Sequence, residues 1–308
     1  MTADGIAFLG PEGTFAHAAA QQLTTDGAWL RPFPSVTQAI DAVHDGLAAA
    51  AVVPLENSVE GAVPATLDAL TTEHPLVIRA ETYLPVVFDL MVRPGTARAA
   101  VRSVATHPHA EAQVRRYLLD RLPDAAVHLV GSTAAGAQAV RAGEYDAAVA
   151  PVLAGQLYQL QTLDHDVADN AGAVTRFVLL SPPAPPPPRT GNDRTTLVTF
   201  LRENHSGALL QILTEFASRG VNLTRIESRP TKEQLGQYCF SIDCEGHLAD
   251  ARVADTLAAL HRVCASVRYL GSYPRQDGRQ SELQPGTDDP DFQAAAVWLA
   301  AVRDRGGL

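Results

Sequence analysis

The chain has 308 residues, of which 46% are hydrophobic and 19% are charged, which is the composition of a globular protein. Its length predicts two domains, and its formal net charge of −10 argues against nucleic-acid binding, because proteins that bind phosphates gather basic residues on one surface. No uncharged apolar stretch of about 20 residues predicts a membrane-spanning helix, and the first ten residues do not resemble a secretory signal. We therefore expect a cytoplasmic protein that does not bind a membrane.

The three cysteines, Cys239, Cys244 and Cys264, all lie in the last quarter of the chain. An odd number without a Cys-x-x-Cys spacing fits neither a disulfide framework nor a zinc site. We expect small buried thiols in a reducing compartment. The sequence indicates no metal and no cofactor.

A proline-rich segment divides the chain. Residues 181–193 read SPPAPPPPRTGND. Proline removes backbone donors and favours an extended conformation, so we expect a semi-rigid linker over 182–193. This linker separates an N-terminal block, 1–181, from a C-terminal block, 194–274, and a tail follows over 275–308.

The N-terminal block alternates short β-like runs with helical patterns, which is typical of a mostly parallel α/β sheet. Strands are predicted at 6–10, 49–55, 103–107, 126–132, 146–151 and 175–180, with extended segments within 76–92. Helices are predicted at 14–23, 36–45, 64–70, 110–122 and 133–142.

The C-terminal block has the order strand, helix, strand, strand, helix, strand. Its elements are predicted at 195–202, 207–219, 221–229, 238–244, 251–264 and 267–273. This βαββαβ order is the ferredoxin-like pattern. In the tail, the polar residues 275–289 are followed by a short predicted helix over 292–302.

The segment GPEGTFAHAAA, residues 10–20, follows a strand and opens a helix. Its two glycines allow a ligand to approach the backbone, and Thr14 stands where a helix cap belongs. Free N–H groups and the positive end of the helix dipole would favour a carboxylate or phosphate. An ordinary strand–turn–helix connection explains the same residues, and the glycine spacing is not that of a dinucleotide fingerprint.

Two further segments place polar residues at strand ends. Glu56, Asn57 and Ser58 directly follow the predicted strand 49–55, where ligands of open α/β sheets bind, although a polar loop with a helix cap is equally consistent. Thr175 and Arg176 precede the apolar run 177–180. An arginine there can bind a carboxylate through two hydrogen bonds, or it can be a surface residue of an edge strand.

In GVNLTRIESRP, residues 220–230, strand alternation puts Asn222, Thr224 and Ile226 on one face and Leu223, Arg225 and Glu227 on the other. The alternative is an edge strand with paired surface charges. His107 and His109 flank Pro108, and we interpret them as loop residues for which a role in a site stays open.

Taken in order, GPEGTFAHAAA, VPLENSVEGAV, TRFVLL and GVNLTRIESRP resemble the prephenate dehydratase family, whose members make phenylpyruvate from prephenate for phenylalanine biosynthesis. The resemblance runs from residue 6 to 273. It implies a two-lobed, periplasmic-binding-protein-like catalytic domain, with lobes over 1–80 plus 168–181 and over 81–167. It further implies an ACT domain over 194–274 that binds L-phenylalanine as a feedback inhibitor at a dimer interface, and a homodimer or homotetramer.

The resemblance also implies the site residues. The catalytic positions are Thr175, Arg176 and Glu56. The substrate-binding positions are Thr14, Phe15, Asn57, Ser58, Ser132, Thr133 and Phe177. The effector positions are Gly207, Ala208, Leu209, Asn222, Leu223, Glu227, Ser228, Arg229 and Pro230. We expect Thr175 to hydrogen-bond the leaving hydroxyl, and Glu56 to be the acid if a dry cleft raises its pKa.

One position departs from the family pattern. Members usually carry an asparagine two or three residues before the TRF motif, where this chain has Gly172 and Ala173, and its nearest asparagine is Asn170. Two other functions stay open. One is an arogenate dehydratase, which performs the same chemistry on an amino-group analogue, and the other is a non-catalytic amino-acid sensor.

Overall fold

The computed structural model describes residues 5–24, 28–72, 75–231, 237–277, 279 and 282–305. The chain forms two compact units. The first unit comprises residues up to 66 together with 82–180, and the second comprises 67–81 together with the residues from 181 onward. Parts of the predicted turn before Tyr238 and of the predicted tail lie outside the described residues.

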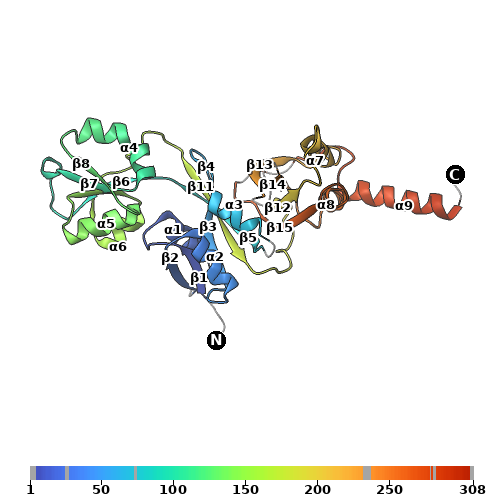
Figure 1. The fold of residues 1–308 in the computed structure, drawn as a ribbon, viewed down its shortest axis with the longest axis horizontal. Coiled ribbons are helices and arrows are strands. Elements are labelled where there is room, and N and C mark those ends of the chain that lie inside the picture. The colour runs from blue at the N-terminus through green and yellow to red at the C-terminus, as the bar shows by residue number, and fades with distance from the viewer. Residues whose placement is uncertain are drawn as a thin grey trace. The chain divides into compact units, whose positions relative to one another are not determined.

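Lobe 1 of the first unit is built on a sheet with the strand order β2-β1-β3-β11-β5, and β4 pairs with β3 (Figure 1). Its strands are β1 (Gly5–Leu9), β2 (Trp29–Phe33), β3 (Ala50–Asn57), β4 (Gly61–Ala62), β5 (Val77–Pro85) and β11 (Val174–Ser181). Its helices are α1 (Phe15–Leu23) and α2 (Val36–His44). Most residues of the next helix, α3 (Pro64–Leu70), and of β5 belong to the second unit. The small residues of α1 allow this helix to pack closely on Phe8 and Val52, which forms the core of the lobe.

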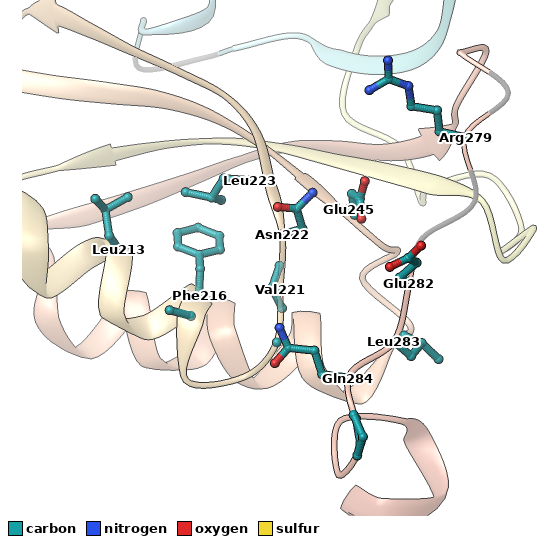
Figure 2. Close-up of a pocket in the computed structure, with 13 residues that line it drawn as sticks. Leu213, Phe216, Val221, Asn222, Leu223, Glu245, Arg279, Glu282, Leu283 and Gln284 are labelled. Atoms are coloured by element: carbon teal, nitrogen blue, oxygen red, sulfur yellow. The ribbon is translucent and has the colours of Figure 1, made fainter.

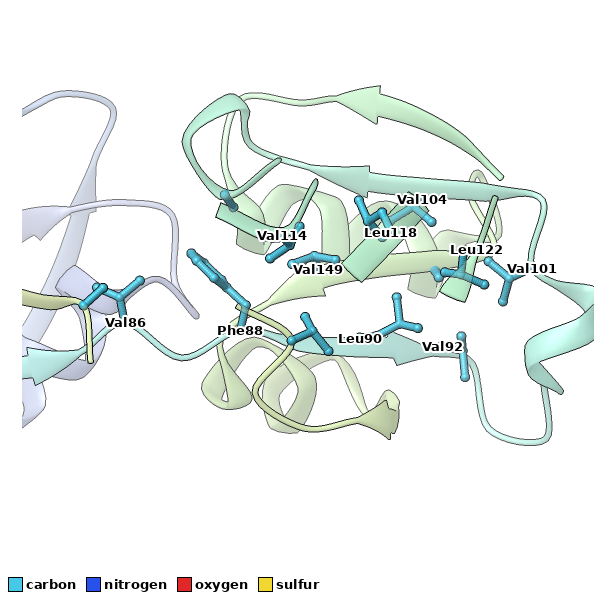
Figure 3. Packing of buried hydrophobic residues seen from close by; sticks show 14 residues of the cluster. Val86, Phe88, Leu90, Val92, Val101, Val104, Val114, Leu118, Leu122 and Val149 are labelled. Carbon is cyan, nitrogen blue, oxygen red and sulfur yellow. The ribbon is translucent and has the colours of Figure 1, made fainter. Parts of the chain in front are cut away.

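Lobe 2 has the strand order β10-β6-β9-β7-β8. Its strands are β6 (Asp89–Val92), β7 (Ser103–Thr106), β8 (Ala126–Leu129), β9 (Ala147–Ala150) and β10 (Gln161–Asp164). Its helices are α4 (Pro108–Arg121), α5 (Thr133–Ala142), α6 (Val152–Tyr158) and the 3₁₀ turn η1 (Arg98–Ala100). Leu90 of β6 and Val149 of β9 pack beneath Val114 and Leu118 of α4 (Figure 3).

The second unit contains a four-stranded antiparallel sheet with the order β13-β14-β12-β15. Its elements are β12 (Asp193–Phe200), α7 (Ala208–Ala217), β13 (Leu223–Pro230), β14 (Tyr238–Glu245), α8 (Ala251–Val263), β15 (Ser266–Pro274) and α9 (Asp289–Arg305). Leu197 and Ile242 from the sheet pack with Phe216 of α7 and Leu260 of α8. The predicted two-lobed α/β block followed by a ferredoxin-like block is therefore confirmed.

The described parts of the segment 67–81, namely 67–72 and 75–81, precede lobe 2 in sequence and pack against the sheet of the second unit. Asp68 forms an ion pair with Arg229 at 2.5 Å, and the Thr71 carbonyl accepts a hydrogen bond from Arg268. A Cβ at Gly271 would lie 2.3 Å from the carbonyl oxygen of Ile78, and the φ of this glycine is +134°. Only glycine therefore allows the segment to approach β15 this closely.

The proline-rich segment has no regular secondary structure, as predicted, and it contacts the second unit along its length. The Pro185 carbonyl accepts a hydrogen bond from Arg79, and the Pro187 carbonyl lies 3.0 Å from Nε2 of His247. Arg189 forms an ion pair with Asp250 at 2.6 Å. These contacts fix the linker along the second unit.

Five short elements of the first unit were not predicted: β2, β4, η1, α6 and β10. β2 is a largely exposed edge strand that contains Pro32, and α6 has only seven residues including Gly155. Periodicity is weak over such lengths. The expectation of three buried thiols is confirmed. Among the residues that the structure describes, no helix is long and apolar enough to cross a bilayer.

Candidate active site

The antiparallel pairing of β3 with β11 brings together two motifs that lie far apart in sequence. Thr175 stands opposite Asn57, and the side-chain amide of Asn57 donates a hydrogen bond of 2.8 Å to Oγ1 of Thr175. The Asn57 Oδ1 atom accepts from the backbone N–H groups of Val59 at 2.8 Å and Glu60 at 3.0 Å. Because these two donors fix the amide orientation, Thr175 accepts at this contact, and its own O–H remains available to donate elsewhere.

Two helices begin beside these residues. Thr14 caps α1 by accepting from the N–H of His17 at 3.3 Å, and Ser132 caps α5 by accepting from the N–H of Ala135 at 2.9 Å. Each helix N-terminus carries about half a positive charge. Both caps contribute to the same cavity, so the cavity presents two positive helix ends to a ligand.

The cavity has a volume of about 460 Å³, and both lobes of the first unit form its wall. Seven of the ten predicted catalytic and substrate-binding residues line it: Thr14, Phe15, Asn57, Ser132, Thr133, Thr175 and Phe177. Phe15 meets Phe88 edge to face, with ring centroids 5.6 Å apart. Together these rings give part of the wall an apolar surface that suits a ring-shaped substrate.

The other three predicted residues, Glu56, Ser58 and Arg176, lie outside this wall. Ser58 joins the strands, since its hydroxyl accepts from the N–H of Val174 at 2.9 Å. Arg176 is only 3% exposed, and its Nη1 atom lies 4.0 Å from Oε2 of Glu56. The Glu56 side chain is 37% exposed, so the dry surroundings on which its predicted acid role depends are not found there.

The wall also holds a polar group that the motifs did not predict: Glu60 from lobe 1, and His107, His109 and Gln113 from lobe 2. His107 and His109 are not loop residues, because His107 caps α4 and His109 lies in its first turn. His109 bonds to Glu60, and Nε2 of Gln113 lies 3.4 Å from the other Glu60 oxygen. The sequence feature that could have indicated this group is His107. It stands at the end of the predicted strand 103–107 and directly before Pro108, where a helix begins.

Burial, together with electrostatic repulsion from the neighbouring His109, lowers the pKa of His107 below its usual value. Nδ1 of His107 accepts a hydrogen bond of 3.3 Å from the N–H of His109. In the neutral ring, Nε2 therefore carries the proton. His107 is thus a neutral hydrogen-bond donor on the cavity wall.

His17 links the Thr14 loop to the lobe 1 core. Its ring stacks on Phe8 with centroids 4.9 Å apart, and its Nδ1 atom accepts from the N–H of Gly13 at 3.0 Å. Burial lowers the pKa of His17 below its ordinary value of 6.5. The folded state therefore favours the neutral ring, whereas the unfolded chain takes up a proton near pH 6.5.

It follows that the free energy of unfolding should decrease as the pH falls below about 6.5. We expect H17N, which keeps an acceptor for Gly13, to reduce this slope in thermal melts between pH 7.5 and 5.5. The matched control is H44N, because His44 is an exposed histidine in the same lobe. Equal slopes in wild type and H17N would refute this role of His17.

Comparison with known proteins follows the same division of the chain. The family model described as prephenate dehydratase matches residues 6–185, and the model described as ACT domain matches residues 195–262. The curated prephenate dehydratase of Amycolatopsis methanolica is 50% identical over 299 residues, which cover 97% of each chain. The chain belongs to the prephenate dehydratase family. Its second block is an ACT domain, as the sequence motifs implied.

Two solved structures carry the comparison further. The prephenate dehydratase from Arthrobacter aurescens, solved in complex with L-Phe, superposes with a TM-score of 0.91 at 45% identity, covering 97% of this chain and 99% of that one. A protein described as a novel type of quorum quenching acylase, GqqA, has a TM-score of 0.80 at 35% identity, covering 89% and 99%. Because proteins of this fold are described both as a prephenate dehydratase and as an acylase, the function has to be argued from the residues of the cavity rather than from the fold.

In the ACT domain, two predicted effector residues, Asn222 and Leu223, line a cavity of about 780 Å³ (Figure 2). Phe216 from the end of α7 and Glu245 from the end of β14 lie on the same wall. Figure 2 also shows Glu282, Leu283 and Gln284 of the tail bordering this cavity.

The remaining effector residues lie elsewhere. Gly207, Ala208 and Leu209 line a second cavity, of about 390 Å³, at the start of α7. The ten residues of α7 span about 15 Å, so one amino acid cannot reach both ends of the helix in a single chain. Glu227, Ser228 and Pro230 lie outside both cavities, and so does Arg229, which pairs with Asp68.

Proposed function

We propose that the cavity of the first unit binds prephenate and converts it to phenylpyruvate, carbon dioxide and water. The observation that carries this proposal is the hydrogen bond from Asn57 to Thr175. It fixes the Thr175 oxygen as an acceptor and leaves its proton to be donated into the cavity. In this family, the oriented Thr175 hydroxyl can supply the hydrogen bond that the departing ring hydroxyl of prephenate needs.

The reaction must expel a hydroxide from the ring of prephenate while the bond to the ring carboxylate breaks. The electron pair of that bond enters the ring, which becomes aromatic, and the departing oxygen takes a proton and leaves as water. A hydrogen bond from Thr175 stabilises the charge that develops on this oxygen. Its own pKa is too high for full proton transfer, so Thr175 acts as an oriented donor, and neutral His107 on the same wall is a second candidate donor.

Prephenate also carries two carboxylates that must be held in one pose. The N-termini of α1 and α5, capped by Thr14 and Ser132, offer backbone N–H groups and positive dipole ends to these groups. Arg176 does not line the cavity. Its buried guanidinium, 4.0 Å from the Glu56 carboxylate, adds positive charge behind the cavity wall. Phe15 and Phe177 provide the apolar surface beside the substrate ring.

A comparison of substrates tests this proposal. Purified protein is given prephenate or arogenate, and phenylpyruvate or phenylalanine formation is followed. We expect a larger kcat/KM for prephenate. A larger value for arogenate would assign the chain to the amino-group substrate, and turnover of neither substrate above its spontaneous rate would contradict the proposal.

We further propose that the ACT domain binds L-phenylalanine between two copies of the chain. The two effector cavities lie at opposite ends of α7. A two-fold arrangement with two α7 helices side by side would bring the Gly207 end of one copy to the Asn222 end of the other. Each ligand would then contact both chains, so binding would favour one arrangement of the pair. This proposal requires a homo-oligomer, a dimer or tetramer, and we place it in the cytoplasm.

Replacing Asn222 should weaken inhibition without changing basal turnover. The Asn222 carbonyl accepts from the N–H of Glu245, a backbone contact that N222A keeps. We expect the phenylalanine concentration for half-inhibition to rise at least about tenfold, which corresponds to about 1.4 kcal/mol of lost binding. The control is H261A, at an exposed position on α8 of the same unit. Unchanged inhibition of N222A would show that the effector binds elsewhere.

A further inference from the structure

The C-terminal helix α9 exposes an unusual amount of apolar surface. Residues 294–302 read AAAVWLAAV without a charge, and Val297, Trp298 and Leu299 are 65%, 62% and 42% exposed. Its start is tied to the domain, where Oδ1 of Asp289 accepts from the N–H of Ala251 at 2.8 Å and Oδ2 pairs with Arg189 at 2.5 Å. An isolated helix of 17 residues with such a surface is marginally stable in water.

Four apolar residues of α9, one of them a small alanine, follow a coiled-coil spacing. Phe292, Ala295, Leu299 and Val302 are separated by three, four and three residues, which places them on one seam along the helix. Trp298 flanks this seam. The opposite face is formed mainly by small residues such as Ala294, Ala300 and Ala301, and Val297 is its exception. The seam therefore has the composition of a helix-pairing surface.

Charge gives this seam a direction. α9 begins with Asp289, which pairs with Arg189 at 2.5 Å, and with Asp291, whereas residues 303–305 in its last turn read RDR and carry one net positive charge. Parallel pairing of two such helices would place aspartates beside aspartates. Antiparallel pairing places the arginine of one helix beside the aspartates of the other, which is favourable.

The same pairing also matches the seam residues by size. Centred on Val297, it sets Phe292 opposite the partner's Val302, and Ala295 opposite the partner's Leu299. Each large side chain of the central pair then meets a small one, as interdigitated packing requires. Two independent features of α9, the order of its charges and the sizes of its seam residues, thus select the same arrangement.

We propose that α9 pairs antiparallel with α9 of a second copy of this chain, through the seam Phe292, Ala295, Leu299 and Val302. The helix is about 25 Å long. Pairing along one helix of this length buries less surface than the roughly 800 Å² per partner of a typical stable interface. The α9 contact therefore strengthens an assembly that other surfaces also hold.

Cysteine cross-linking tests the direction. Positions 289, 296 and 303 lie on one line beside the seam, seven residues apart. In the antiparallel pair centred on Val297, the two copies of position 296 lie on the same side of the seam and only about 3 Å apart along the helix axis, whereas the two copies of position 303 lie about 18 Å apart. The native cysteines are buried, so a short bismaleimide reacts with the introduced thiol. We expect A296C to give covalent dimers at low concentration and R303C to remain monomeric on denaturing gels.

A seam substitution provides the second measurement. We expect L299E to abolish cross-linking of A296C and to weaken the assembly in sedimentation experiments, while A300E, with the same charge one residue away and off the seam, does neither. Basal turnover should be the same in all variants, since α9 lies outside the catalytic cavity. Cross-linking of both A296C and R303C, of neither, or of A296C in the L299E background would overturn the proposal.

Discussion

Replacing Thr175 with alanine is expected to lower kcat for prephenate about 10²–10³-fold, because one oriented donor to a developing oxyanion is typically worth this much. The KM should change little, since the helix N-termini hold the carboxylates and remain in place. Steady-state assays of phenylpyruvate formation measure both constants. The substitution removes the hydroxyl that Asn57 orients at 2.8 Å, and leaves the β3–β11 pairing intact.

Two companion variants show whether the hydroxyl itself is responsible. T175S retains a hydroxyl and should recover most of the lost rate, whereas T175V, similar in shape to threonine, should be as slow as T175A. An H107N variant separates the second candidate donor, because it should change the pH dependence of kcat if His107 supplies the proton. Near-normal kcat in both T175A and T175V would exclude Thr175 from the chemistry.

Loss of Arg194 should destabilise the second unit strongly. Its guanidinium contacts Glu81 at 2.5 Å and Asp277 at 3.2 Å, and Arg275 joins Asp277 and Glu245 at 2.7 Å each. Glu81 and Arg194 are 1% and 3% exposed. R194M leaves a buried carboxylate without its cation, which typically costs about 3–5 kcal/mol. Denaturant unfolding should therefore show a markedly lower free energy of unfolding.

The double variant R194M/E81M removes both charges and should recover part of this loss, since buried ion pairs can often be replaced by apolar residues. R115M is the matched control, because Arg115 pairs with Glu111 on the exposed face of α4, and it should leave stability almost unchanged. If the double variant were as unstable as R194M, loss of side-chain packing rather than an uncompensated charge would explain the effect.

This ion-pair network also connects two functional regions along the chain. Glu245 lines the Asn222 cavity, and the contacts of Arg275, Asp277 and Arg194 lead from it to Glu81. Glu81 lies on β5, which continues directly to Val86 and Phe88 on the wall of the catalytic cavity. Variants of Arg194 that still fold are thus suited to measuring whether phenylalanine inhibition depends on this network.

Local features of the fold could be predicted from the sequence because their causes are local. Thr14 before an alanine-rich run predicts the capped start of α1, and the βαββαβ order of the second block follows from alternating periodicities. The contact of Asn57 with Thr175 could not be derived in this way. The two residues lie 118 positions apart, and β11 runs antiparallel to β3 in a sheet that was expected to be mostly parallel.

Other features depend on tertiary packing that no motif encodes. Residues 67–81 give no sign that they cover the sheet of the second unit, because only the close approach of Gly271 to Ile78 makes this packing feasible. Similarly, the resemblance implies one effector site at a dimer interface for Gly207 and Asn222, but no motif gives the length of α7, which separates the two residues within one chain.

The most direct test of the account is the turnover of prephenate by the purified protein at neutral pH, with L-phenylalanine titrated into the assay. Phenylpyruvate is detected as its enolate after alkali is added. The account predicts rapid product formation that phenylalanine suppresses in wild type and far less in N222A. Product formation at no more than the spontaneous rate, together with measurable phenylalanine binding, would contradict it and identify the chain as a sensor.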